Sequence, residues 1–302
     1  MTVVSPNGPW GIGPEKQGVQ ALTNHPHARR AALLAGALAV AFALPVAAQD
    51  DDVGGASPFH IFDKPGPETR TRLGIGPGFA PSYPGSDDVQ IYPVLEFERV
   101  DSDRPFDFEA PDESFGFDLF STSGFSIGPV VNFEDSRKSE DVGTTLPEVG
   151  FSVEPGVFVQ MDFGENFRLR SEVRKGVSGH KGWIATAGGD VILRDRDEWL
   201  FSVGPRVTWS DDRYHDAYFS VAPADAPAAG LPAFDADGGI QAYGALASTL
   251  FQVSKNWGLL LYGKYDRLTG DAADSPIVLT YGSRDQFSFG GAITYTFGPG
   301  VK

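Results

Sequence analysis

The feature that most constrains the fold is a strict alternation of apolar and small polar residues near the C-terminus. Between Gln286 and Phe297, large apolar side chains and one glycine occupy every second position, and Ser, Gly, Ala and Thr occupy the others. A period of two predicts a β-strand with one apolar face. Phe297 follows Phe287 by ten residues. At about 3.3 Å per residue and a tilt near 40°, that length spans roughly 25 Å, the height of the lipid-facing band of a membrane barrel.

A second segment has the same length and the same aromatic ends. From Trp199 to Trp209 an apolar residue or proline alternates with Ser, Gly, Arg and Thr. Alternation alone is also typical of a soluble β-sandwich. Two strands with one length scale and an aromatic residue at each end favour a single bilayer.

Composition excludes several classes of protein. The 302 residues include 37 glycines and no cysteine, so neither a disulfide scaffold nor a helical bundle is indicated. The formal net charge of −16 makes nucleic acid an unfavourable partner. It also disfavours attachment to anionic lipid through a basic patch.

The N-terminal region has the pattern of an exported protein. Arg29 and Arg30 precede the apolar run 31–44, and small residues follow up to Ala48. This pattern predicts a signal peptide cleaved near Ala48, since the apolar run is shorter than the roughly twenty residues that span a membrane as a helix. Residues 49–69 are acidic and rich in Pro and Gly, which predicts a flexible periplasmic arm. The expected organisation is therefore an N-terminal extension and signal peptide (1–48), an arm (49–69), a barrel (70–297) and a C-terminal tail (298–302).

Alternating segments recur from residue 70 onward and predict about twelve strands, an even number as in single-chain bacterial barrels. They cover residues 70–80, 89–99, 104–110, 113–121, 123–133, 156–163, 166–176, 181–194, 198–209, 239–253, 256–267 and 285–297. No sustained helical periodicity appears beyond the signal peptide, so we expect an all-β antiparallel transmembrane barrel with few helical residues.

The connections alternate in length, as they do in outer-membrane barrels. With both termini in the periplasm, the short turns lie on the periplasmic side. The three longest connections, 134–150, 210–238 and 268–284, lie outside the cell. Tyr214 to Val221 then belongs to an external loop and is not a membrane strand.

Charged residues occupy the face opposite the apolar one. The predicted lumen charges are Arg168, Arg170, Glu172, Arg174, Asp190, Arg206, Lys264 and Asp266, and Arg194 has the same parity. Unpaired charges on this scale do not fit a soluble core, which supports the barrel. Two interpretations remain open: a salt-bridge network that fills a narrow lumen, or an arginine-rich pore for anions.

Aromatic residues at the strand ends predict the membrane interfaces. The expected girdle comprises Trp199, Trp209, Trp257, Tyr265, Phe287 and Phe297.

Three further motifs are weak signals for chemistry. Glycines at 74, 76 and 78 lack the spacing of a phosphate-binding loop, and the segment 235–238 lacks the glutamate that closes a calcium loop. His180 and His215 lie in expected loops without a nucleophile motif. We therefore expect no enzymatic activity, no metal and no cofactor.

Several motifs together resemble the MipA/OmpV family, the MltA-interacting outer-membrane proteins of Gram-negative bacteria. Their residues are Gly74, Gly76, Gly78, Tyr83, Gly85 and Ser86, then Gly179 and His180, then Gly270, Asp271, Ser275 and Pro276. The resemblance runs from about residue 70 to Phe297. It implies a barrel in contact with outer-membrane lipid. It also implies a scaffold role that joins a murein transglycosylase to a peptidoglycan synthase in the periplasm. A small porin-like channel and a surface adhesin are the alternatives.

Overall fold

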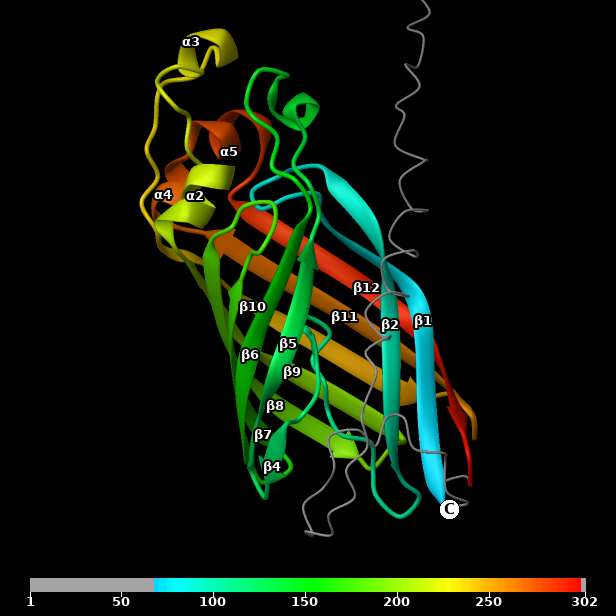
Figure 1. The fold of residues 1–302 in the computed structure, drawn as a ribbon. Coiled ribbons are helices and arrows are strands. Elements are labelled where there is room, and N and C mark those ends of the chain that lie inside the picture. Colours follow the sequence, from blue (N-terminus) through cyan, green and yellow to red (C-terminus); the bar gives the residue numbers. More distant parts are fainter. Residues whose placement is uncertain (1–67, 300–302) are drawn as a thin grey trace, which may run out of the picture. The chain divides into compact units, whose positions relative to one another are not determined.

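The computed structural model describes residues 68–299. The expected signal peptide, the arm up to residue 67 and the last three residues of the tail lie outside this range. Within it the chain is an antiparallel all-β sheet that curls into a barrel-like wall, as predicted (Figure 1). Strand β1 begins at Thr69, the last residue assigned to the arm.

Twelve strands and a few short helical segments make up the described chain. The strands are β1 (Thr69–Pro81), β2 (Val89–Asp101), β3 (Phe115–Gly116), β4 (Phe120–Thr122), β5 (Phe125–Glu134), β6 (Ser152–Phe163), β7 (Phe167–Lys175), β8 (Trp183–Asp195), β9 (Trp199–Ser210), β10 (Gly239–Gln252), β11 (Trp257–Leu268) and β12 (Asp285–Phe297). The helical segments are η3 (Ser139–Val142), α2 (Asp212–Tyr218), α3 (Ala226–Ala229), α4 (Gly270–Asp274) and α5 (Pro276–Tyr281). No helix in residues 68–299 is long and apolar enough to cross a membrane.

Neighbouring strands in the chain are neighbours in the sheet. Each strand from β5 to β12 pairs with the next, β12 pairs with β1, and β1 pairs with β2. Leu73 of β1 lies opposite Tyr295 on one side and opposite Phe97 on the other. The first and last strands of the chain, β1 and β12, are therefore paired side by side, as in a closed barrel.

Side chains on the two faces of the wall follow the predicted parity. On β7, Phe167 is 55% exposed and points outward, whereas Arg168 is only 2% exposed. The register of β6, β7 and β8 carries this alternation across three strands. An apolar exterior and a charged interior are the inverse of a soluble β-sandwich, and this arrangement suits a lipid exterior.

One predicted strand is absent. The stretch from Asp103 to Ser114, which includes the expected strand 104–110, forms no strand and lies inside the wall, where its side chains contact the lumen charges. We call it the inner segment. The strand expected over 113–121 is broken into β3 and β4, which pair with β5. The prediction failed because Phe106 and Phe108 alternate like lipid-facing residues but stack on arginines in the lumen.

The wall consequently has two strand edges that do not pair with each other. Within the described range, β2 pairs only with β1, and β3 and β4 pair only with β5. We call the gap between β2 and β3–β4 the seam. The inner segment runs from one side of the seam to the other, because it follows β2 and precedes β3 in the chain.

The long connections gather at one end of the sheet, where Figure 1 shows α2, α3, α4 and α5 together. They enclose a hydrophobic cluster that includes Tyr83, Val142, Tyr218, Phe219 and Ile277. We call this end the cap, and the opposite end, with short turns such as 164–166 and 196–198, the short-turn end. The stretch 214–221 lies in a long connection as predicted, and most of it is helix α2.

Candidate functional site

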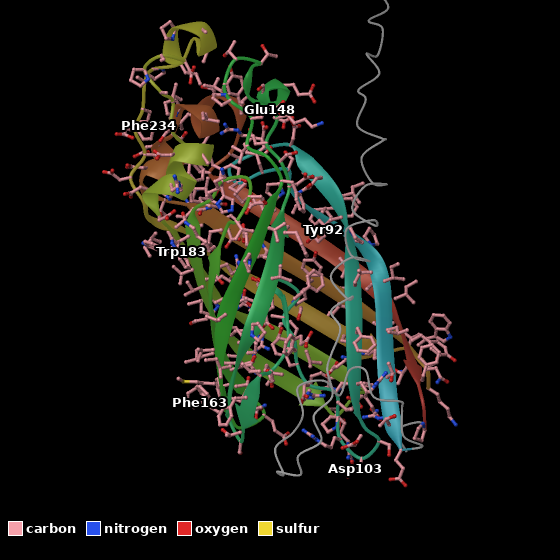
Figure 2. The ribbon with its side chains drawn as sticks, in the orientation of Figure 1. Tyr92, Asp103, Glu148, Phe163, Trp183 and Phe234 are labelled. Atoms are coloured by element: carbon pink, nitrogen blue, oxygen red, sulfur yellow. The ribbon has the colours of Figure 1, made fainter. Side chains whose placement is uncertain are left out.

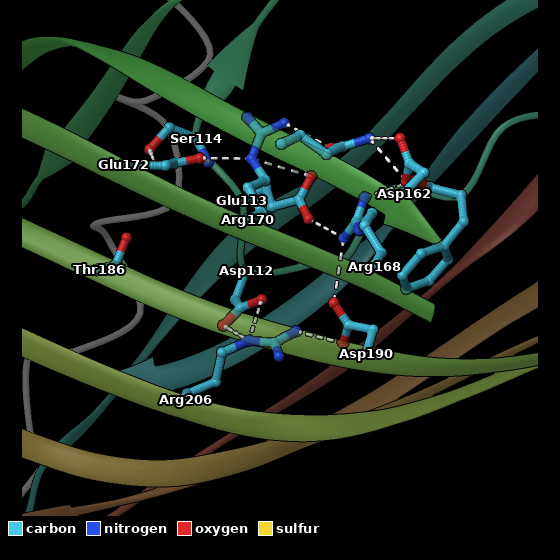
Figure 3. Close-up of polar contacts among 12 residues, drawn as sticks. Asp112, Glu113, Ser114, Asp162, Arg168, Arg170, Glu172, Thr186, Asp190 and Arg206 are labelled. Atoms are coloured by element: carbon cyan, nitrogen blue, oxygen red, sulfur yellow. Dashed lines mark hydrogen bonds and ion pairs between the residues drawn. The ribbon is translucent and has the colours of Figure 1, made fainter. Parts of the chain in front are cut away.

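The predicted lumen charges form one continuous network inside the wall. Figure 3 shows Arg168, Arg170 and Glu172 on β7, with Asp190 on β8 and Arg206 on β9 beside them. Arg206 Nη2 donates to Asp190 Oδ1 at 2.8 Å, and Arg168 Nη2 lies 3.3 Å from Asp190 Oδ2. Adjacent strands place these groups at matching heights, because Arg168 is in register with Asp190 and Gly188 with Arg206.

The remaining predicted lumen residues extend this network in both directions. Arg174 binds Glu172 at 2.7 Å and Glu154 at 3.1 Å. Lys264 binds Asp266 at 3.1 Å, on the other side of the lumen. Arg194 alone lies apart, at the short-turn end, where it contacts Asp197.

The part of the inner segment nearer the cap supplies carboxylates to this network. Asp112 accepts from Arg206 at 3.0 Å and from Lys264 at 3.2 Å. Glu113 pairs with Arg168 and lies 3.6 Å from Arg170. Because these anions neutralise cations of three different strands, the segment acts as an electrostatic tie across the lumen.

The part of the inner segment nearer β2 is bound at the short-turn end through Phe106. Asp197, in the turn between β8 and β9, binds Arg70 Nη1 at 2.6 Å and accepts from the backbone N–H of Phe106 at 2.9 Å. The Phe106 ring lies beneath two guanidinium groups, 4.7 Å from Arg70 and 4.3 Å from Arg72. Cation–π contacts of this kind are stronger where water is excluded.

Sequence reasoning missed the residues that hold the inner segment. Arg70, Arg72 and Asp197 were not assigned to the lumen. Asp112 fell between two expected strands, and Glu113 stood at the start of the second. A signal was present for Arg70 and Arg72. They share the parity of Gly74 and Gly76, on the face opposite Leu73 and Ile75, and thus on the lumen side of the first strand.

The family-motif residues divide into two places. Gly74, Gly76 and Gly78 lie on β1 in the wall. The others lie in or against the cap: Tyr83, Gly85, Ser86, Gly179, His180, Gly270, Asp271, Ser275 and Pro276. Ser275 shows their role, because its hydroxyl donates to the Phe219 carbonyl at 2.6 Å and accepts from the N–H of Ile277 to begin α5.

His180 connects the cap to the lumen network. Its Nε2 lies 3.0 Å from Glu154 Oε1, and its ring packs edge-on against Tyr214 at 4.7 Å. The Tyr214 hydroxyl in turn donates to the Glu134 carboxylate at 3.3 Å. Burial, with Glu134 nearby, raises the pKa of Tyr214 well above its usual range, so this phenol stays a hydrogen-bond donor.

Glu134, Glu154 and His180 bring three potential metal-binding atoms within 4.8 Å of one another. The hydrogen bonds do not suit a metal. The N–H of Gly182 donates to His180 Nδ1 at 3.0 Å, so Nδ1 is the acceptor and Nε2 carries the proton that faces Glu154. A metal would need the Nε2 lone pair, and Glu154 is already bound by Arg174 and Asn132. This geometry favours a proton-bearing hydrogen-bond network.

A polar chamber of about 200 Å³ lies between the inner segment and the cap. Its lining includes Asp112 and Glu113 below, Tyr214 and Glu134 at the cap side, and Thr186 in the wall. Space of this size holds a few water molecules. The inner segment thus separates this chamber from the short-turn end.

The expected girdle residues lie at the ends of the strands. Trp199, Trp209, Trp257, Phe287 and Phe297 are exposed large hydrophobic residues. Tyr265 is partly buried and donates to Asp285 at 2.6 Å while it packs against Phe287.

Comparison with known proteins identifies a family. The family model described as MltA-interacting protein MipA matches residues 73–297. No curated protein sequence matches the chain significantly.

The chain is also similar to solved outer-membrane proteins. These include OmpT of Vibrio cholerae (9% identity, 76% of this chain and 97% of that chain, TM-score 0.30). OprG from Pseudomonas aeruginosa has 9% identity over 77% of this chain and 97% of that chain, with a TM-score of 0.22. A Pseudomonas aeruginosa FadL homologue has 10% identity over 77% of this chain and 64% of that chain, with a TM-score of 0.25. Superpositions this loose do not bear on the activity of this chain. The family match, which spans most of the barrel-like wall, establishes that the chain belongs to the MipA family of MltA-interacting proteins.

Proposed function

We propose that this outer-membrane β-barrel protein is a scaffold for peptidoglycan-remodelling enzymes on the periplasmic side. Its apolar outer face and its family support the membrane location. The name of the family supports a partner of murein transglycosylase type, and the resemblance stated above adds a peptidoglycan synthase. No catalytic role for the protein itself belongs to the proposal.

The observation that carries the proposal is the character of the short-turn end. Exposed charged residues of both signs occupy its turns: Asp103, Glu165, Asp195, Arg196, Glu198 and Lys255. Figure 2 shows Asp103 and Phe163 at this end, with Glu148 and Phe234 at the other. Strand β1 also begins at this end, at Thr69. The inner segment contacts the short-turn end from inside the wall, through the hydrogen bond from the Phe106 N–H to Asp197.

The proposed periplasmic interaction is tested with a variant that changes the exposed charges of the short-turn end but keeps the ion pairs that stabilise the barrel. The variant lacks residues 49–67 and carries Asp195→Lys, Arg196→Glu and Glu198→Lys. Arg194 and Asp197 are retained because they contact each other and Asp197 holds Arg70. We expect cross-linking in intact cells to lose the transglycosylase and the synthase. Unchanged recovery of both enzymes would contradict the proposal.

The matched control changes charges at the opposite end. Arg213 and Asp235 are exposed cap residues. Arg213→Glu with Asp235→Lys should leave recovery of the periplasmic enzymes unchanged. Loss of recovery in this control would show that the readout reports general damage.

The structure bears differently on the two alternatives, a porin-like channel and a surface adhesin. A permanently open porin does not fit a lumen that is crossed by the inner segment and its ion pairs. A surface adhesin would bind its partner through the cap. Liposome swelling distinguishes a channel from the scaffold, and cross-linking from outside the cell distinguishes an adhesin from it.

A further inference from the structure

The seam has the geometry of a wall that lacks one strand. Strand β2 lies at one edge of the sheet and β3–β4 at the other. Because successive strands in the sheet alternate in direction from β2 to β3 across eleven positions, the two edge strands run the same way. Antiparallel closure between them requires one more strand that runs in the opposite direction.

The inner segment has the direction and position of that strand. It leaves β2 at the short-turn end and returns toward the start of β3, so it runs opposite to both edges. It is also joined covalently to the two strands between which it would fit. Counting β3 and β4 as one interrupted strand, its insertion makes the wall twelve-stranded and even.

A hairpin turn already aligns the inner segment with β2. The N–H of Arg104 donates to the Asp101 carbonyl at 3.1 Å, which closes a turn around Ser102 and Asp103. Continuing this register upward places Phe108 opposite Phe97 and Ala110 opposite Leu95. In β2, Phe97 and Leu95 face outward. The apolar residues of the inner segment would therefore face lipid, and Asp107 and Glu109 would face the lumen.

A membrane also disfavours an open edge. Along residues 89–97, the edge of β2 away from β1 pairs with no strand of the described range, and hydrocarbon cannot satisfy backbone N–H and C=O groups at such an edge. In the lumen, by contrast, the inner segment gains ion pairs from Asp112 and Glu113. Insertion would also bring Asp107 opposite Glu98, and like charges at that position oppose the inserted state. The two positions are therefore in competition.

From these observations we infer that residues 103–114 are a mobile twelfth strand, which closes the lumen when inside and opens a conducting path when inserted at the seam. This activity is independent of the scaffold function. With the segment in the wall, its ion pairs with Arg168, Arg206 and Lys264 would be lost, and Asp107, Glu109 and Glu113 would face these cations across the vacated lumen. Small polar solutes would then pass through a lumen lined by charges of both signs.

A cysteine pair tests the inserted position directly, because the chain has no native cysteine. In Phe97→Cys/Phe108→Cys, the two side chains would be cross-strand neighbours only after insertion. In the lumen position Phe108 stacks on Arg168, 4.4 Å from its guanidinium, while Phe97 faces outward, so no disulfide can form. We expect an intramolecular disulfide upon oxidation in outer membranes. We expect a several-fold larger oxidised fraction when Asp112→Asn and Glu113→Gln are added.

Control variants distinguish the possible outcomes. Leu73→Cys/Phe97→Cys joins a pair that is in register between β1 and β2, and it should oxidise fully. Full oxidation of this control with none of the Phe97/Phe108 pair, in either background, would overturn the inference. A disulfide between two copies of Phe97→Cys alone would overturn it as well, because a second chain would then cover the β2 edge. The Phe108→Cys single variant must show the same heat-modifiable mobility as the parent.

Conductance tests the gating half of the inference. In planar bilayers, the oxidised Phe97→Cys/Phe108→Cys protein should show resolved single-channel steps. Reduction should remove most of them. Identical recordings before and after reduction would overturn the link between the strand position and the open lumen.

Discussion

Arg70 and Asp197 lie 127 positions apart in the chain and form an ion pair of 2.6 Å, buried at the short-turn end. Asp197 also accepts from the Phe106 N–H, and Arg70 donates to the Arg104 carbonyl. The pair therefore links the first strand, the β8–β9 turn and the inner segment. Substitution of either residue therefore affects the contacts of all three.

Asp197→Ala should destabilise the barrel substantially. The change leaves the Arg70 guanidinium buried without its anion, which typically costs about 3–5 kcal/mol. We expect a lower urea midpoint of unfolding in detergent micelles and faster protease cleavage between Ser102 and Ser114. Asp195→Ala, in the same turn but exposed, is the control and should match the parent. Equal midpoints for both variants would show that the pair contributes little.

Gly76 should be intolerant of any side chain. A Cβ at this position would lie 1.9 Å from the Gly291 carbonyl oxygen of β12, so Gly76→Ala forces apart the strands that join the two ends of the chain. Overpacking of this kind costs about 1–3 kcal/mol, and we expect less folded protein on unheated gels. Gly263→Ala is the control, because a Cβ there meets nothing within 4 Å. A normal folded fraction for Gly76→Ala would contradict this role of the glycine.

The wall could be predicted from the sequence because lipid imposes one rule on every strand. Phe167 and Arg168 show it: hydrocarbon requires the first to face outward and excludes the second. The confirmed antiparallel fold was predicted from that alternation together with the common length of the strands and their aromatic ends. The glycine at 76 was also interpreted as a strand residue, and the close approach of β12 gives the reason.

The inner segment could not be predicted because the same alternation has two physical solutions. Phe106 and Phe108 satisfy a period of two equally well against lipid and against the guanidinium groups of Arg70 and Arg168. Only the three-dimensional position of the cations decides between them.

The hydrophobic core of the cap was not predicted for a related reason. Tyr83, Tyr218 and Ile277 lie in three separate loops, and each loop alone has too few apolar residues to indicate a core.

Glu154 should be essential to the junction between the lumen and the cap. It accepts from Arg174 Nε at 3.1 Å and from Asn132 at 3.0 Å, and it faces His180 Nε2. Glu154→Leu leaves a buried guanidinium and an imidazole N–H with fewer acceptors, and we expect a loss of about 3 kcal/mol or more in urea unfolding. Glu154→Gln keeps one acceptor and should lose less.

A chelator distinguishes this network from a metal site. Because His180 Nε2 carries a proton, EDTA should leave the unfolding temperature of the parent protein unchanged. A drop that zinc reverses, and that Glu154→Gln abolishes, would show a metal at Glu134, Glu154 and His180 instead.

His215 should make the cap sensitive to acid. The side chain is 1% exposed and packs edge-on against Phe219 at 5.2 Å. Burial lowers its pKa below the usual 6.5, although Asp271, Asp212 and Asp211 act in the opposite direction. The folded cap thus binds a proton less readily than the unfolded segment does. Stability is fully present above pH 6.5 and is lost as the pH falls from there toward the lowered pKa of the folded state.

The measurement is proteinase K cleavage within residues 219–238, normalised at each pH to an unfolded peptide substrate. Cleavage of the parent should accelerate between pH 7.5 and 5. His215→Phe keeps the aromatic contact with Phe219 but removes the titrating group, so its normalised cleavage should change less over the same range. Parallel pH profiles for the two proteins would assign the acid sensitivity to another group. A slower cleavage of the parent at pH 5 would have the wrong sign for a buried neutral histidine, because protonation would then stabilise the cap.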